Sequence, residues 1–230
     1  MIYLYAIVDR LDMPLPTAVD LQETQLEVLR HREIGAVVGR CANVDTAPTA
    51  EAVWQHEQII ETLMEDRAVL PVRFGAVLAD NAALVAELET HYVDLTADLA
   101  RLRGHVELAV RVLGDDDGPP EHEQEQARPA TCGTGRGYML ALVEQQRRAG
   151  QLVEQIHGSL AGLAVDSTSQ VLITPRMLLK SAYLVDRDTV PAFQREINSL
   201  CEAHPALNIL CTGPWPPFSF VTDSIGGEEQ

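Results

Sequence analysis

The feature that most constrains this fold is an acidic, proline-containing stretch near the middle of the chain. Three aspartates, Asp115 to Asp117, precede a glycine and two prolines, and the run to Pro129 contains almost no apolar side chain. Such a segment cannot bury enough surface to join a core, so it predicts an exposed linker. We therefore expect two small domains, residues 1–114 and 136–230, joined by a linker at residues 115–135.

The first domain is expected to combine short strands with two helices. Apolar residues at three- and four-residue steps predict one helix over residues 50–67, and Asp80 is expected to cap another that ends at Gly104. Continuous or alternating apolar runs predict strands at residues 2–8, 25–29, 34–41, 69–75 and 105–113. This order is typical of an α+β fold, a ferredoxin-like sandwich with one extra strand.

The second domain shows a helical pattern from about residue 136 to 164, with a break expected at Gly150 or Gly158. Asp188 is expected to cap a second helix. Strands are predicted at residues 171–173, 177–185 and 207–211. The prediction is a pair of helices packed with a small antiparallel sheet.

Charge limits the classes of partner. The formal net charge of −17 disfavours nucleic acid and anionic lipid surfaces, which attract clustered lysine and arginine. The N-terminus has no positive region ahead of its apolar run, and no run is long enough to span a bilayer, so we expect neither a signal peptide nor membrane insertion. The four cysteines form no C-x-x-C pair. These features indicate a cytoplasmic protein with reduced thiols.

No catalytic, cofactor-binding or metal-binding residue is predicted. The glycines of Gly133–Gly137 precede a helix, but they lack the G-x-G-x-x-G spacing and a Walker lysine, which favours a flexible lead-in over an anion site. The seven histidines lack the spacing of metal ligands, and the carboxylates are spread along predicted solvated faces.

Arg73 interrupts an apolar run, so its guanidinium must emerge on an exposed strand face or meet a buried carboxylate. Two interpretations stay open: a structural ion pair where the domains meet, and a contact with a partner.

The segment Thr212–Phe220 holds three prolines, a tryptophan and two phenylalanines close to the C-terminus. Proline stiffens the chain, so we expect an extended ribbon that must dock on something. Three interpretations stay open. The segment could be a P-x-x-P ligand, or an apolar contact for a partner. It could also be a strap that closes the second domain, with Phe218 and Phe220 facing its core. Trp215, Pro216 and Pro217 are the candidate contact or structural residues.

Several blocks of the sequence resemble the GvpF/GvpL family of gas vesicle proteins. The most specific are Val69–Gly75 and the Thr212–Phe220 ribbon. The others are Tyr3–Val8, Gly135–Tyr138 and Leu178–Val185, and together the blocks cover nearly the whole chain.

The resemblance implies a non-enzymatic accessory protein of gas vesicle assembly with a two-domain α+β fold. Its implied partners are the hydrophobic shell protein and other accessory proteins, either in the cytoplasm or as a minor vesicle component. No catalytic residue carries over. The alternative is a small-molecule sensor or enzyme on a ferredoxin-like scaffold, which would need a cleft with converging polar groups, such as Arg73 and several carboxylates.

Overall fold

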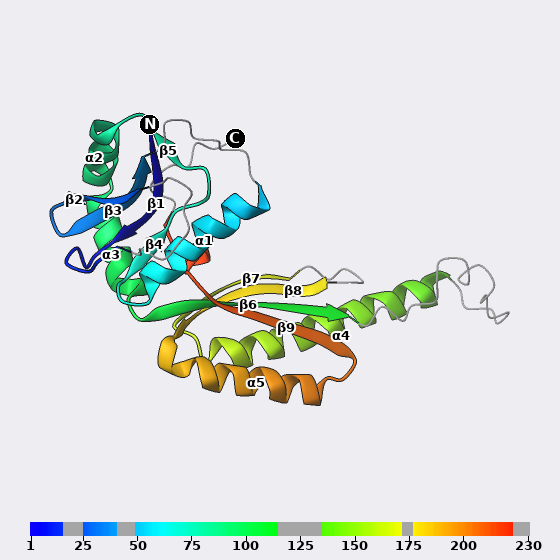
Figure 1. The fold of residues 1–230 in the computed structure, drawn as a ribbon. Coiled ribbons are helices and arrows are strands. Elements are labelled where there is room, and N and C mark those ends of the chain that lie inside the picture. The colour runs from blue at the N-terminus through cyan, green and yellow to red at the C-terminus, as the bar shows by residue number, and fades with distance from the viewer. Residues whose placement is uncertain (16–24, 41–48, 115–134, 172–176, 223–230) are drawn as a thin grey trace. The chain divides into compact units, whose positions relative to one another are not determined.

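The chain forms two compact units in a computed structural model that describes residues 1–15, 25–40, 49–114, 135–171 and 177–222 (Figure 1). The first unit comprises Met1–Glu107 and Pro214–Gln230, and the second comprises Leu108–Gly213. Both units combine helices with an antiparallel sheet, which confirms the predicted α+β class. None of the described helices combines the length and apolar character needed to cross a membrane.

The sheet of the first unit has five strands with helices on both faces. Its order is β2-β3-β1-β4, and β5 also pairs with β1. Helix α1 covers one face, and α2 and α3 cover the other (Figure 1). The strands are β1 (Ile2–Val8), β2 (Leu26–His31), β3 (Ile34–Arg40), β4 (Val69–Pro71) and β5 (Val77–Leu78), and the helices are α1 (Ala50–Met64), α2 (Asn81–Thr90) and α3 (Tyr92–Leu102).

Strand β1 is buried along its whole length, as its continuous apolar sequence predicts. Its pairing with β3 shifts between Leu4 and Ala6, which marks a β-bulge. Because the bulge resets the alternation of side chains, Tyr3, Tyr5, Ala6 and Val8 all join one core cluster with Ile59, Ile60 and Leu63 of α1. The bulge therefore brings two tyrosines and two small residues under the same helix.

The second helical stretch of the first unit begins where the sequence predicts and then breaks. The Asp80 carboxylate accepts a hydrogen bond from the backbone N–H of Ala83 at 2.9 Å, which confirms the predicted cap. The expected single helix is wrong, because the backbone of His91 (φ −102°, ψ 12°) leaves the helical region and separates α2 from α3. Gly104, with φ +79°, ends α3 as expected.

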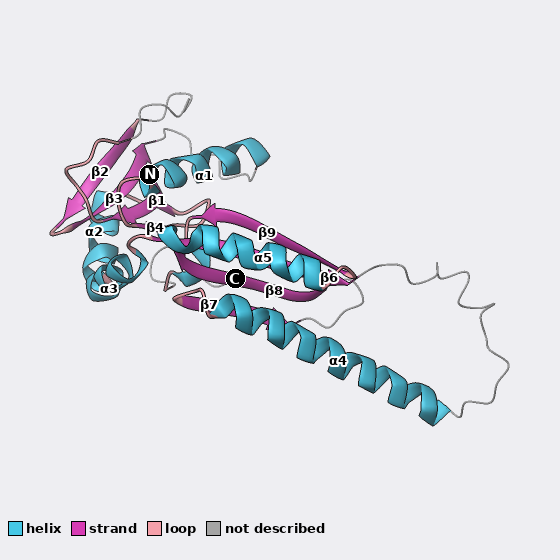
Figure 2. Ribbon diagram, turned by 90° about the horizontal axis from the view of Figure 1, so that it is seen from below, coloured by secondary structure: helices cyan, strands magenta, loops and turns pink. Residues whose placement is uncertain are grey.

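The second unit packs two helices on one face of a four-stranded sheet, as Figures 1 and 2 show from two directions. The strand order is β7-β8-β6-β9. Tyr183, Phe193 and Ile156 are fully buried in the core between the sheet and the helices. The elements are β6 (His105–Gly114), α4 (Gly135–Ala161), β7 (Asp166–Val171), β8 (Met177–Asp186), η1 (Arg187–Thr189), α5 (Val190–Ala203) and β9 (Leu207–Trp215), with η2 (Phe218–Phe220) beyond them.

The boundaries of the units differ from the predicted domains. Strand β6 was expected in the first sheet, but it lies between β8 and β9 in the second, and β5 is the fifth strand of the first sheet. The chain therefore passes to the second unit at Leu108 and returns at Pro214. Residues 115–134 of the predicted linker, with Gly133 and Thr134 among them, lie outside the described residues, whereas Gly135–Gly137 belong to α4.

Two local predictions in the second unit are also wrong. Helix α4 is continuous through Gly150 and Gly158, because an isolated glycine weakens a long helix without ending it. Asp188 does not cap α5; Asp186 instead accepts from the N–H of Asp188 at the start of η1, and Thr189 precedes α5. Most of the strand predicted at residues 171–173 lies outside the described residues, which omit 172–176.

Candidate interaction site

A buried histidine fixes the loop that follows β4. His56, on the inner side of α1, holds its Nε2 2.8 Å from the carbonyl oxygen of Val72. Since a carbonyl oxygen only accepts, Nε2 carries the proton, and Nδ1 accepts from the hydroxyl of Tyr3 at 3.1 Å. The same hydroxyl accepts from the N–H of Gly75 at 2.9 Å. One helix and one strand therefore hold both ends of the Val72–Gly75 loop.

The imidazole is neutral in this arrangement. Burial lowers the pKa of His56, and the hydrogen bond to the Val72 carbonyl opposes that effect only in part. A proton on Nδ1 would remove the acceptor that the Tyr3 hydroxyl uses. The network therefore favours neutral His56 and is complete at neutral pH.

Aromatic packing completes the support of the loop. Tyr5 stacks on His56 with ring centroids 5.3 Å apart, and Phe74 meets the rings of His56 and Tyr3 edge-on at 5.7 and 6.0 Å. Gly75 has φ +91°, a conformation that strains any residue with a Cβ. The loop is consequently held in one conformation from both sides.

Arg73 is the exposed residue of this loop. It lies between buried Val72 and half-buried Phe74, so its side chain takes the exposed alternative and is not buried against a carboxylate. A partner contact through Arg73 remains a prediction.

The C-terminal ribbon docks on the first unit, not on the second domain as expected. It is extended only as far as Trp215, the last residue of β9, whose side chain is 41% exposed. Pro216 and Pro217 are buried, and Phe218–Phe220 form the 3-10 turn η2. Phe220 is buried in the first unit and not in the core of the second domain, and Phe218 is half-buried against the cluster that contains Tyr3 and Ile59.

Two carboxylates hold the ribbon in place. Buried Glu107 accepts from the backbone N–H and the hydroxyl of Ser219, at 2.8 and 2.7 Å. Asp98 accepts from the N–H of Thr222 at 2.9 Å, and Arg101 bridges Asp98 to the carbonyl oxygen of Phe220. Burial acts to raise the pKa of Asp98, but the hydrogen bonds from Thr222 and Arg101 outweigh it and hold the pKa below its usual range.

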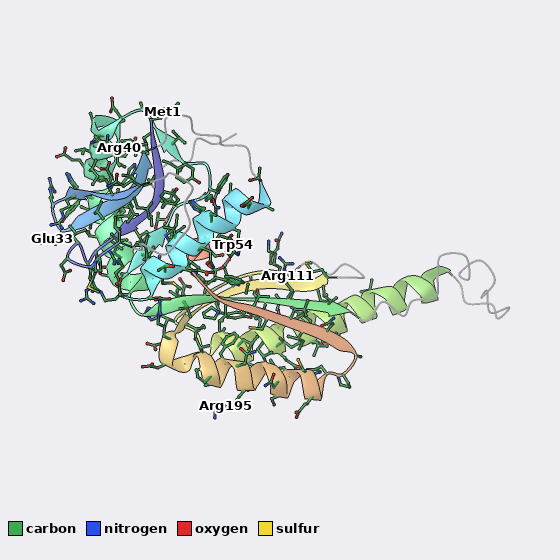
Figure 3. All side chains as sticks on the ribbon, viewed as in Figure 1. Met1, Glu33, Arg40, Trp54, Arg111 and Arg195 are labelled. Carbon is green, nitrogen blue, oxygen red and sulfur yellow. The ribbon has the colours of Figure 1, made fainter. Side chains whose placement is uncertain are left out.

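Trp54 is an exposed residue that the sequence analysis missed. The inward side of α1 is occupied by His56, Ile59, Ile60 and Leu63. At about 100° per residue, position 54 falls on the opposite side of the helix. The indole is 59% exposed and projects from α1 away from β1 (Figure 3). The sequence did carry this signal, because a tryptophan out of phase with the apolar stripe of a helix must face outward.

A hollow of about 250 Å³ elsewhere in the first unit bears on the enzyme or sensor alternative. Its lining includes Asp9, Glu33, Thr96 and Arg103, but not Arg73. One oxygen of Asp9 lies 2.6 Å from the guanidinium of Arg103, and the other accepts from the N–H of Ala68 at 3.0 Å. Both carboxylate oxygens are therefore engaged in contacts within the first unit. Among the described residues, no group of three or more histidine, cysteine or carboxylate side chains could hold a metal ion.

Comparisons with known proteins point to one family. The family model described as gas vesicle synthesis protein GvpL/GvpF matches residues 1–222. Gas vesicle protein F1 of Halobacterium salinarum is 27% identical, covering 100% of this chain and 96% of that protein. Gas vesicle protein L of a Streptomyces species is 28% identical, covering 95% of this chain and 92% of that protein.

Solved structures match the fold over nearly the whole chain. The crystal structure of GvpF from an Anabaena species gives a TM-score of 0.78 at 18% identity, covering 97% of this chain and 98% of that one. GvpF from Microcystis aeruginosa gives 0.74 at 18% identity, covering 96% and 98%. At this identity the likeness supports the fold alone.

Proposed function

Because the chain belongs to the GvpL/GvpF family of gas vesicle synthesis proteins, we propose that it is a non-enzymatic accessory protein of gas vesicle assembly. The match over residues 1–222 confirms the resemblance seen in the sequence and is the observation that carries this function. The partners we propose are the hydrophobic shell protein and other accessory proteins. The protein would act in the cytoplasm and at the gas vesicle, where it is either a transient factor or a minor component.

A physical need supports this role. A shell subunit with a strongly apolar face aggregates unless that face is covered before polymerisation. Exposed tryptophans are effective contacts because they bury a large apolar area with few rotatable bonds. Trp54 and Trp215 offer such contacts on the first unit, and the net charge of −17 keeps the carrier dispersed.

The other candidate residues divide by burial. Arg73 is exposed on a loop that Tyr3 and His56 fix, which suits a contact that loses little entropy on binding. Pro216 and Pro217 are buried, so we assign them the role of holding Trp215 in place.

A pull-down with the shell protein and the other accessory vesicle proteins tests this function. The intact chain should retain at least one of them, and Trp54→Ala and Trp215→Ala should weaken retention by about tenfold or more if these are central contacts. Arg73→Ala should have a smaller effect, because an exposed charge contributes little.

Val93→Ala provides the matched control. Val93 is an apolar residue on α3, 75% exposed, on the opposite side of the first sheet from α1. Its substitution should leave retention unchanged. The proposed function fails if the intact chain retains no vesicle protein, and the choice of surface fails if Val93→Ala has the same effect as Trp54→Ala.

A further inference from the structure

The face of the second sheet opposite α4 and α5, here called the open face, carries two exposed cations, while Ala182 and Leu184 further along it are buried. Helices α4 and α5 cover the opposite face, where Val110 and Val112 of β6 and Leu179 and Tyr183 of β8 are buried. Because side chains alternate along a strand, Arg111 and Lys180 lie on the open face. Both are exposed, and Figure 3 shows Arg111 projecting from the sheet away from α4 and α5.

The two cations are neighbours. Strands β6 and β8 are adjacent, and the hydroxyl of Ser181 lies 3.5 Å from the carbonyl oxygen of Val110. Arg111 follows Val110 and Lys180 precedes Ser181, so both reach the open face at the same level of the sheet. Strands in a sheet lie about 4.8 Å apart, and like charges on adjacent strands repel each other.

Among the residues that the structure describes, none beside this pair neutralises it. Neither Arg111 nor Lys180 makes an ion pair with any residue that the structure describes. The cross-strand neighbour of Lys180 on β7 is the uncharged Gln170, and the acidic residue of that strand, Asp166, pairs with Leu184. Asp166 is therefore four positions from Gln170, about 13 Å along the strand.

Apolar side chains flank the charges on the same face. Leu113 is half-buried, and Leu210 on the edge strand β9 is 44% exposed. We name Arg111, Leu113, Lys180 and Leu210 together the basic face. A surface of this kind suits a ligand that supplies carboxylates beside uncharged side chains.

We propose that the basic face binds an extended acidic segment of a partner protein, in which carboxylate side chains alternate with uncharged ones. An extended peptide presents every second side chain to one surface, which matches a flat sheet carrying cations between leucines. Nucleic acid fits less well, because two cations neutralise few of its closely spaced phosphates, whereas they match the few carboxylates of a short peptide. This face lies on the second unit, so it stands independently of Trp54 and Trp215.

Fluorescence anisotropy of the full chain with labelled synthetic peptides tests this assignment. The probe alternates glutamate with threonine and valine, and a second peptide carries lysine in place of glutamate. The intact chain should bind the glutamate peptide and not the lysine peptide, and binding should weaken as salt is added. The double variant Arg111→Ala, Lys180→Ala should bind about tenfold more weakly, as expected for the loss of two exposed charge contacts.

Arg195→Ala is the control for a loss of positive charge elsewhere, because it removes one guanidinium from the outer side of α5 (Figure 3). Its affinity should stay within about twofold of the intact chain. If Arg195→Ala lowered the affinity for the glutamate peptide as much as the double variant does, net charge alone would explain the effect, and the assignment would be overturned. So would an intact chain that binds neither peptide, or one that binds a single-stranded oligonucleotide more tightly than the glutamate peptide.

Discussion

At the scale of single residues, His56 joins three parts of the first unit through one ring. Its Nε2 holds the carbonyl of Val72, and its Nδ1 holds the Tyr3 hydroxyl that in turn holds Gly75. Nothing in a single sequence pairs these positions, because the contacts join residues far apart in the chain. The sequence did mark the loop itself, as an apolar run interrupted by Arg73.

Acidification should destabilise the first unit through His56. Burial lowers the pKa of the folded imidazole below its ordinary value of 6.5, so the unfolded chain binds more protons in the window below pH 6.5. Neutral His56 therefore makes its full contribution to the free energy of unfolding above pH 6.5. This contribution falls as the pH drops toward the pKa of the folded imidazole. Urea titrations at about pH 7.5 and about pH 5.5 measure the difference.

The variant His56→Gln should reduce this pH dependence, because glutamine does not titrate. Its amide offers a donor and an acceptor, so we expect a loss of only about 1–3 kcal/mol at neutral pH. Trp54 and Trp215, the two tryptophans of the chain, both belong to the first unit, so their fluorescence reports its unfolding. His204→Gln in the second unit is the control. An unchanged pH dependence in His56→Gln would contradict the assignment.

At the scale of elements, local patterns were predictable and pairings were not. The continuous apolar run of β1 and the cap at Asp80 follow from nearest neighbours in the sequence. The alternating valines and leucines of β6 are compatible with any sheet that has one covered face. The sequence pattern therefore did not predict which of the two sheets β6 joins. The ribbon was likewise predictable as stiff and aromatic, whereas its docking partner depends on Glu107 and Asp98, more than a hundred residues away.

Removing the side-chain cap of α2 should lower the free energy of unfolding of the first unit, and a residue that can still cap should restore it. Asp80→Ala leaves the N–H of Ala83 without its acceptor and should lower the free energy of unfolding of the first unit by about 1 kcal/mol. Asp80→Asn retains a side-chain oxygen and should restore most of this loss. Urea unfolding followed by tryptophan fluorescence measures both variants, and equal losses would argue against a capping role.

The ribbon should loosen when Glu107 loses its carboxylate. Glu107→Ala removes the acceptors of both the backbone N–H and the hydroxyl of Ser219. Hydrogen exchange at the Ser219 amide should accelerate by about tenfold, which corresponds to the loss of one buried hydrogen bond. Ser219→Ala, which keeps the backbone contact, should leave exchange of its own amide less affected. Unchanged exchange in Glu107→Ala would show that Glu107 does not anchor the ribbon.

At the scale of the whole molecule, the chain does not divide at its most obvious linker. The first unit is discontinuous, since residues Pro214 onward return to it after the second unit is complete. The polar composition of Asp115–Pro129 predicted a domain boundary at that stretch. The stretch follows β6, however, and β6 already belongs to the second sheet, so the boundary lies earlier in the chain. A cut at the linker therefore separates β6 from the strands on either side of it.

Fragments cut at the two kinds of boundary should behave differently. The fragment of residues 108–213 contains α4, α5 and the greater part of each of the four strands of the second sheet. We therefore expect it to fold, and its thermal unfolding followed by circular dichroism should be cooperative. Residues 136–230 lack β6 and with it Leu108, Val110 and Val112, which are at most 1% exposed. Burial of three such side chains contributes roughly 5–9 kcal/mol, comparable with the whole stability of a small domain, so this fragment should not fold. Val110→Asp in the 108–213 fragment should reproduce that failure, and cooperative unfolding of residues 136–230 would refute the placement of β6 at the centre of the second unit.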